Sequence, residues 1–130
     1  TKEYAPISWQ HAKEMDSSVV KVESHTVTHP ILPNVDADQL DFELSRSKET
    51  LEENLERSVE HFCYPNGTLN RDVEKAAQKA GYKSAVTTEY GFNDGRSNIF
   101  LLKRIDASPN IANFAQSVSG FEQLRQRINM

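Results

Sequence analysis

Apolar and polar positions along the chain change between a helical period and a strand period, and these changes predict nine elements. The predicted helices cover residues 7–15, 38–59, 70–80, 111–119 and 121–128. The predicted strands cover residues 18–24, 61–64, 82–88 and 99–105. Alternation of strands and helices is typical of an α/β fold with parallel strands.

The longest predicted helix, residues 38–59, is amphipathic. Leu40, Leu44, Leu51 and Leu55 recur at helical spacing, which indicates a face that packs on an apolar layer. Charged residues, including Glu43, Arg46, Glu49, Glu53 and Arg57, are expected on the opposite face, toward solvent. In α/β folds, ligands bind beyond the carboxyl ends of the strands. We therefore expect the chemistry in the segments that follow Glu23, Tyr64, Thr88 and Ile105.

Composition and charge narrow the classes of function. The chain has 130 residues, enough for one domain or part of a larger one, and a formal net charge of −4. This charge argues against a nucleic-acid binder, which needs surplus cations to neutralise phosphates. No apolar run approaches the ~18–20 residues of a membrane span. The single cysteine, Cys63, excludes an internal disulfide framework and a thiolate-rich zinc module.

Two histidines four residues apart are the most distinctive chemical feature. His25 and His29 begin where the strand 18–24 ends, and the β-branched residues between them disfavour a helix. A tight loop can still bring both imidazoles to one point, where they would suit zinc or another late divalent metal. The alternative is that both rings simply hydrogen-bond to backbone. Asp36 and Asp38 could complete a metal site, but capping of the following helix is the favoured role for them.

Three motifs together resemble the polysaccharide deacetylases, the NodB-homology domain of carbohydrate esterase family 4. The sequence SHTVTHP at 24–30 resembles the family's histidine motif, and FCYPNG at 62–67 resembles its F-x-Y-P-x-G variant. LKRI at 102–105 is similar to a later L-x-R-I stretch, and the helix from Trp9 to Met15 also matches. The resemblance spans residues 8 to about 108 and implies a deformed (β/α) barrel, present here in part.

The resemblance also implies roles for individual residues. His25 and His29 would be two of three protein ligands to a divalent metal, usually zinc. The backbone N–H of Asn66 would stabilise the oxyanion, with Pro65 fixing the turn that aims it. Tyr64 would line the sugar groove.

The sequence departs from the family pattern at three places. No T-F-D-D-G-like segment, which supplies the base aspartate and third ligand, occurs after Thr1, and no L-x-x-H acid motif is visible. Cys63 stands where the family has an arginine, and Arg104 is the candidate to replace it. We expect residues 1–130 to form a single domain, the later part of a deacetylase domain, that pairs with a missing N-terminal segment or self-associates.

The expected function is a metal-dependent hydrolase that removes N-acetyl groups from an aminosugar polysaccharide, with this chain alone inactive. The alternative is a non-catalytic carbohydrate- or metal-binding module derived from the same fold, and a third possibility is a plain α/β interaction domain. Family members commonly act at the cell envelope. Imidazoles alone do not choose among zinc, cobalt and nickel, and one sequence does not identify the glycan.

Overall fold

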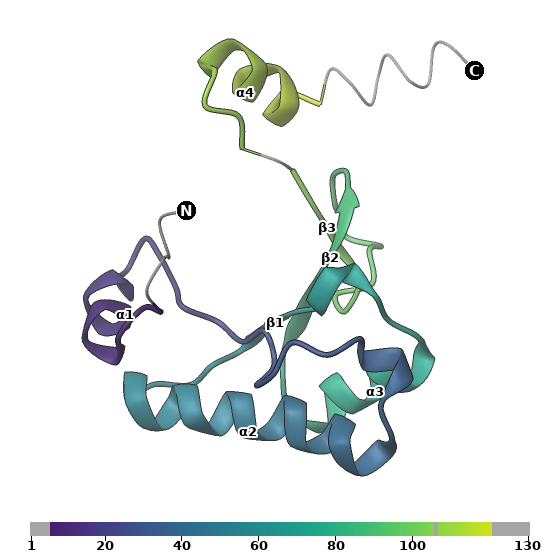
Figure 1. Cartoon of the computed structure of the whole chain (residues 1–130). Coiled ribbons are helices and arrows are strands. Elements are labelled where there is room, and N and C mark those ends of the chain that lie inside the picture. The colour runs from purple at the N-terminus through teal and green to yellow at the C-terminus, as the bar shows by residue number, and fades with distance from the viewer. Residues whose placement is uncertain (1–5, 106, 121–130) are drawn as a thin grey trace, which may run out of the picture.

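The computed structural model describes residues 6–105 and 107–120 of the chain. Four α-helices, two short 3-10 helices and three strands follow one another in this part (Figure 1). In chain order they are α1 (Trp9–Met15), η1 (Leu32–Asn34), α2 (Ala37–Leu55), β1 (His61–Cys63), η2 (Pro65–Gly67), α3 (Arg71–Lys79), β2 (Ser84–Tyr90), β3 (Leu102–Arg104) and α4 (Ile111–Val118). The predicted helix 121–128 lies outside the described residues. None of the described helices has both the length and the apolar character to cross a membrane.

The sheet is parallel throughout, in the order β1-β2-β3. Phe62 pairs with Ala85, Cys63 with Val86, and Val86 with Leu102. An isolated parallel bridge joins Ser24 to Phe62, on the side of β1 that faces away from β2. The prediction of an α/β fold with parallel strands is confirmed.

The predicted strand over residues 18–24 is wrong, because only Ser24 makes a bridge. Before this bridge, side chains and not a neighbouring strand satisfy the backbone of Val22. The N–H of Val22 donates to Asp16 Oδ1 at 2.9 Å, and the Val22 carbonyl accepts from Arg57 at 2.7 Å. A backbone group that already has a partner is unavailable to a β ladder.

The core lies between the helices α2 and α3 and one face of the sheet. Leu44 of α2, Ala77 of α3 and Ala85 of β2 are each fully buried, and Phe62 of β1 is 1% exposed. In Figure 1, α2 runs below the sheet and α4 stands apart from it. This core fixes the position of α2, the helix whose Glu43 contacts the segment that follows Ser24.

Helix ends follow from caps that the sequence supplies. Asn70 caps α3 by accepting from the N–H groups of Asp72 and Val73, as predicted. Helix α2 stops at Leu55 and not at Val59, because Glu56 adopts a left-handed conformation with φ 57°. Val59 is nonetheless fully buried, so the apolar pattern that suggested a longer helix reflects packing after the helix has ended.

Candidate functional site

The candidate site lies where the parallel register brings several strand ends together. His25 directly follows the bridge residue Ser24, and Asn66 lies three residues beyond Cys63 on the adjacent β1. Arg104 ends β3 and pairs with Tyr90 of β2. His25, Asn66 and Arg104 therefore lie at one edge of the sheet, the edge where we expect the chemistry.

The two histidines of the segment 24–30, called here the histidine segment, lie together. Their ring centroids are 4.8 Å apart and the ring planes are inclined by 71°. The chain bends between them, and Thr26 and His29 adopt positive φ angles of 71° and 58°. The Thr26 hydroxyl accepts from the His29 N–H at 3.1 Å, which closes the turn.

The contact of His25 with β1 fixes its tautomer. Its Nδ1 lies 2.6 Å from the carbonyl oxygen of Cys63. Because a carbonyl only accepts, Nδ1 must carry the proton and donate, which leaves the Nε2 lone pair for another partner. Metal-binding histidines are held in this way by an outer hydrogen bond. Bonding to backbone and binding of a metal, treated as alternatives in the sequence, are thus compatible for His25.

Glu43 contacts the histidine segment, and sequence reasoning placed it wrongly. The expectation was a solvent-exposed carboxylate, but the residue is fully buried. Its Oε2 accepts from the N–H groups of Val27 and Thr28 at 2.8 and 2.9 Å, and its Oε1 accepts from the Thr28 hydroxyl and the Gln39 amide. Burial alone would raise the pKa of Glu43, but the hydrogen bonds from Thr28, Val27 and Gln39 outweigh it and lower the pKa.

One signal could have identified Glu43. Its position is three residues after Leu40 and four before Ser47, so it belongs to the same helix face as these two buried residues. The acidic side chain was assigned to the polar face by its chemistry and not by its spacing.

The donor set suits a late divalent metal only in part. Two neutral imidazoles are good ligands for zinc, and the available Nε2 of His25 fits that role. Within residues 6–105 and 107–120, however, no cluster of three His, Cys, Asp or Glu side chains could hold an ion. Asp36 instead caps α2, accepting from the Gln39 N–H at 2.8 Å, which confirms the favoured role.

Residues 64–68, called here the proline turn, present the Asn66 backbone to solvent. Asn66 has φ 55° and ψ 9°, a left-handed conformation that asparagine tolerates better than most residues. The Gly67 and Thr68 N–H groups bond back to Tyr64 and Pro65 at 2.9 and 3.1 Å. In the described part of the chain, no acceptor takes the Asn66 N–H. Its assignment as an oxyanion donor stays a prediction.

Tyr64 and Pro65 are the two residues of the proline turn predicted to bind substrate. Both are buried, and the Tyr64 hydroxyl donates to the Phe100 carbonyl at 3.0 Å. The Tyr64 ring packs edge-to-face on Phe62, and its burial raises the pKa of the phenol. These side chains are therefore placed to hold the proline turn on the sheet, and their contact with a sugar stays a prediction.

Arg104 is exposed and ends β3. Among the described residues, no carboxylate lies within ion-pair distance of its guanidinium. The role of Arg104 in orienting a base aspartate therefore stays a prediction.

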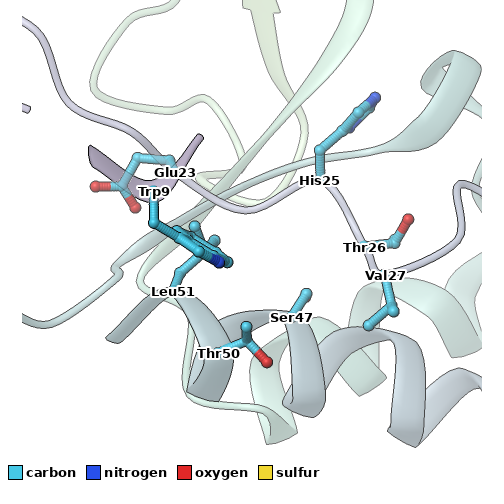
Figure 2. A pocket seen from close by; sticks show the side chains of 8 residues that line it. All are labelled: Trp9, Glu23, His25, Thr26, Val27, Ser47, Thr50 and Leu51. Atoms are coloured by element: carbon cyan, nitrogen blue, oxygen red, sulfur yellow. The ribbon is translucent and has the colours of Figure 1, made fainter. Parts of the chain in front are cut away.

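A cavity of about 350 Å³ lies between the histidine segment and α2. Trp9 and Leu51 form its apolar end, and Val27 points into it (Figure 2). The ring of His25 turns away from Ser47 and Thr50 on α2, toward the opposite side of its backbone. The face that carries the imidazole is therefore not the face that packs on the helix.

Comparison with known proteins gives consistent results. The family model described as Polysaccharide deacetylase matches residues 1–85. The chain is 31% identical over 106 residues to the protein named "Putative polysaccharide deacetylase YxkH" of Bacillus subtilis (strain 168); this covers 82% of the chain and 38% of YxkH.

Two solved structures share the fold over most of the chain. Streptococcus pyogenes deacetylase PplD in complex with acetate is 29% identical, with a TM-score of 0.80, covering 89% of this chain and 52% of PplD. BC0361, a polysaccharide deacetylase from Bacillus cereus, is 32% identical, with a TM-score of 0.75, covering 86% of this chain and 36% of BC0361. The likeness confirms the expected fold class, a partial (β/α) barrel. The chain spans about half or less of the length of these relatives.

Proposed function

Because the chain belongs to the polysaccharide deacetylase family, we propose that the complete protein is a metal-dependent hydrolase that removes N-acetyl groups from an aminosugar polysaccharide. The observation that carries the proposal is the pairing of His25 and His29 at the strand ends. Their ring centroids are 4.8 Å apart, and His25 Nδ1 is already engaged with Cys63. An Nε2 directed to a ligand is what such a site requires.

The chain's own residues take separate parts in the proposed reaction. His25 and His29 would hold the divalent metal, most often zinc, which supplies Lewis acidity toward the amide carbonyl and the attacking water. The exposed N–H of Asn66 would donate to the oxygen that becomes negative during attack. Arg104 would orient a base aspartate contributed by the rest of the protein, and the buried Tyr64 and Pro65 hold the turn that presents Asn66.

The proposal assigns the remaining groups to the part of the protein outside this chain. The described residues provide two imidazoles and no third neighbouring ligand. The third ligand and the base carboxylate would come from a preceding segment or from self-association. We therefore propose that residues 1–130 alone do not deacetylate a glycan.

The test compares two histidine variants of the complete protein. His29→Ala should lower kcat/KM for acetate release from an N-acetylglucosamine oligomer by about 100-fold or more, since loss of merely an outer partner of a metal ligand costs about 10–100-fold. His61→Ala is the matched control, because this exposed ring contacts the Ser84 hydroxyl and lies outside the site. Undiminished acetate release by His29→Ala would contradict the proposal.

A non-catalytic carbohydrate- or metal-binding module is the second candidate. The observation that favours it is the pair of imidazoles without a third ligand among the described residues. It predicts that the complete protein retains N-acetylglucosamine oligomers without releasing acetate, so the same assay separates the two functions.

A further inference from the structure

We propose that Glu43 is a positioning residue of the candidate metal site: through the backbone of the histidine segment, its carboxylate sets the relative placement of the two imidazoles. The inference rests on the proposed function, because it takes His25 and His29 as the ligands. It adds a residue from α2 that lies outside every motif of the resemblance.

The contacts of Glu43 fall between the two ligands. One carboxylate oxygen binds the N–H groups of Val27 and Thr28 at 2.8 and 2.9 Å, and the other binds the Thr28 hydroxyl. Val27 and Thr28 are two of the three residues that lie between His25 and His29. A single side chain therefore fixes three donors in the connection that determines where the rings meet.

The connection needs an external restraint because its backbone is strained. Thr26 and His29, on either side of the pair that Glu43 binds, both have positive φ angles, 71° and 58°. Such angles are unfavourable for residues other than glycine, and most of all for a β-branched one. Such a conformation persists only where the surroundings determine it, and Glu43 provides three hydrogen bonds from a rigid, buried position.

A second anchor holds the start of the same segment on the same helix. Ser47 lies one turn after Glu43 on α2, and its hydroxyl oxygen is hydrogen-bonded to the Ser24 hydroxyl oxygen at 2.8 Å. The Tyr82 hydroxyl also donates to the Ser24 hydroxyl oxygen, at 2.8 Å. All three residues are buried. Helix α2 thus holds the histidine segment before His25 and before His29, which limits how far either ring can shift.

The buried carboxylate of Glu43 also depends on this connection for its hydrogen bonds. No Lys, Arg or His among the described residues forms an ion pair with this carboxylate. Its hydrogen bonds come from the histidine segment and from Gln39. A buried carboxylate requires such donors in place of water. Folding of the segment around Glu43 and burial of Glu43 are therefore mutually dependent.

The test measures zinc affinity in the complete protein by competition with a chromophoric chelator, together with the absorption spectrum of the cobalt(II)-loaded form. Glu43→Ala should weaken zinc binding by about 10–100-fold and change the cobalt spectrum, since it frees both imidazoles from their set positions. Glu43→Gln should restore most of the affinity, because its amide oxygen still accepts from Val27 and Thr28. In deacetylation, the loss should fall on kcat more than on KM.

Leu44→Ala is the control for a merely structural role. Leu44 neighbours Glu43 on α2 and is equally buried, but it faces the core. It should lower thermal stability while zinc affinity stays unchanged. If Glu43→Ala does not fold, Thr28→Val removes one of the three donors with little change of shape, and it should weaken zinc binding several-fold.

The possible results separate this inference from the proposed function. Zinc affinity that is lost in His29→Ala but unchanged in Glu43→Ala and in Thr28→Val would overturn the role of Glu43 alone. An equal loss of affinity in Leu44→Ala would also overturn it. A wild-type protein that binds none of zinc, cobalt and nickel would overturn both the inference and the metal-dependent function.

Discussion

Residues in the left-handed backbone region form both turns of the candidate site. Thr26 and His29 shape the histidine segment, and Asn66 and Gly67 shape the proline turn, with φ between 55° and 71°. Only glycine adopts this region without steric cost. At Gly67 the lack of a side chain is required twice, because a Cβ there would lie 2.1 Å from the Thr88 hydroxyl oxygen.

Gly67→Ala should therefore destabilise the protein by about 1–3 kcal/mol, through backbone strain and the clash with Thr88. The measurement is the free energy of unfolding in urea. Gly95→Ala is the matched control, since its added Cβ would meet nothing within 4 Å, and it should change stability by less than about 0.5 kcal/mol. Equal effects of the two substitutions would contradict this description of the proline turn.

At this scale the proximity of two side chains was predictable where chemistry and spacing agree. His25 and His29 were selected by residue type and position, and the structure brings their rings together. Tyr64 was given a role by resemblance, yet its side chain is buried, which a motif cannot reveal. Glu43 was missed because charge usually means exposure, and its partners lie in a loop 15 and 16 residues earlier.

At the scale of elements, an ionic cluster takes the place of a strand. Arg57, just after α2, donates to Asp16 after α1 through two nitrogens at 2.6 Å and to Glu23 at 3.0 Å. Hydrogen bonds from Arg57 and from the Val22 N–H hold the pKa of Asp16 well below its ordinary value of 3.8. The cluster thus fixes the stretch that leads into the histidine segment.

This cluster predicts a pH-dependent contribution to stability. Because folding lowers the pKa of Asp16, the contribution is complete above the unfolded value of 3.8 and is lost as the pH falls through the lower folded value. Asp16→Asn should be less stable than wild type near neutral pH, and the difference should shrink from about pH 5 to about pH 2. Urea unfolding at several pH values measures it.

Asp41→Asn is the control for this prediction. Asp41 pairs with Lys79 on the surface, where both side chains are about half or more exposed, and such pairs contribute little. A stability difference between wild type and Asp16→Asn that does not vary with pH would contradict the assigned role of the cluster.

Elements with local signals were predictable, and elements set by distant side chains were not. The α3 helix begins after its capping Asn70, as the sequence indicates. The strand at 18–24 failed because Asp16 and Arg57, which occupy its backbone, are brought there by tertiary packing. β3 is also shorter than the predicted 99–105, since only Leu102–Arg104 pair with β2.

At the scale of the whole molecule, one core supports the site. Leu44, Val73 and Ala77 from α2 and α3 pack with Phe62 and Ala85 on the same face of the sheet. The alternation of elements predicted this layer arrangement. The extent of the barrel was not predictable from pattern alone, because the chain spans about half or less of its relatives' length.

Truncation in this core should be costly. Leu44→Ala should lower the free energy of unfolding by about 2–5 kcal/mol, because a fully buried leucine leaves a cavity. Phe42→Ala, two residues earlier on α2, is the control: its side chain is half exposed, so a much smaller loss is expected. Thermal or urea unfolding of both variants measures the difference, and equal losses would contradict the assignment of the α2 faces.

The most direct measurement for the central claim is anomalous diffraction at the zinc absorption edge from crystals of the complete protein grown with zinc. We predict one strong peak about 2.0–2.1 Å from a nitrogen of each of His25 and His29, with His25 Nδ1 still bonded to the Cys63 carbonyl. Zinc bound elsewhere, or no peak between the two rings, would contradict it.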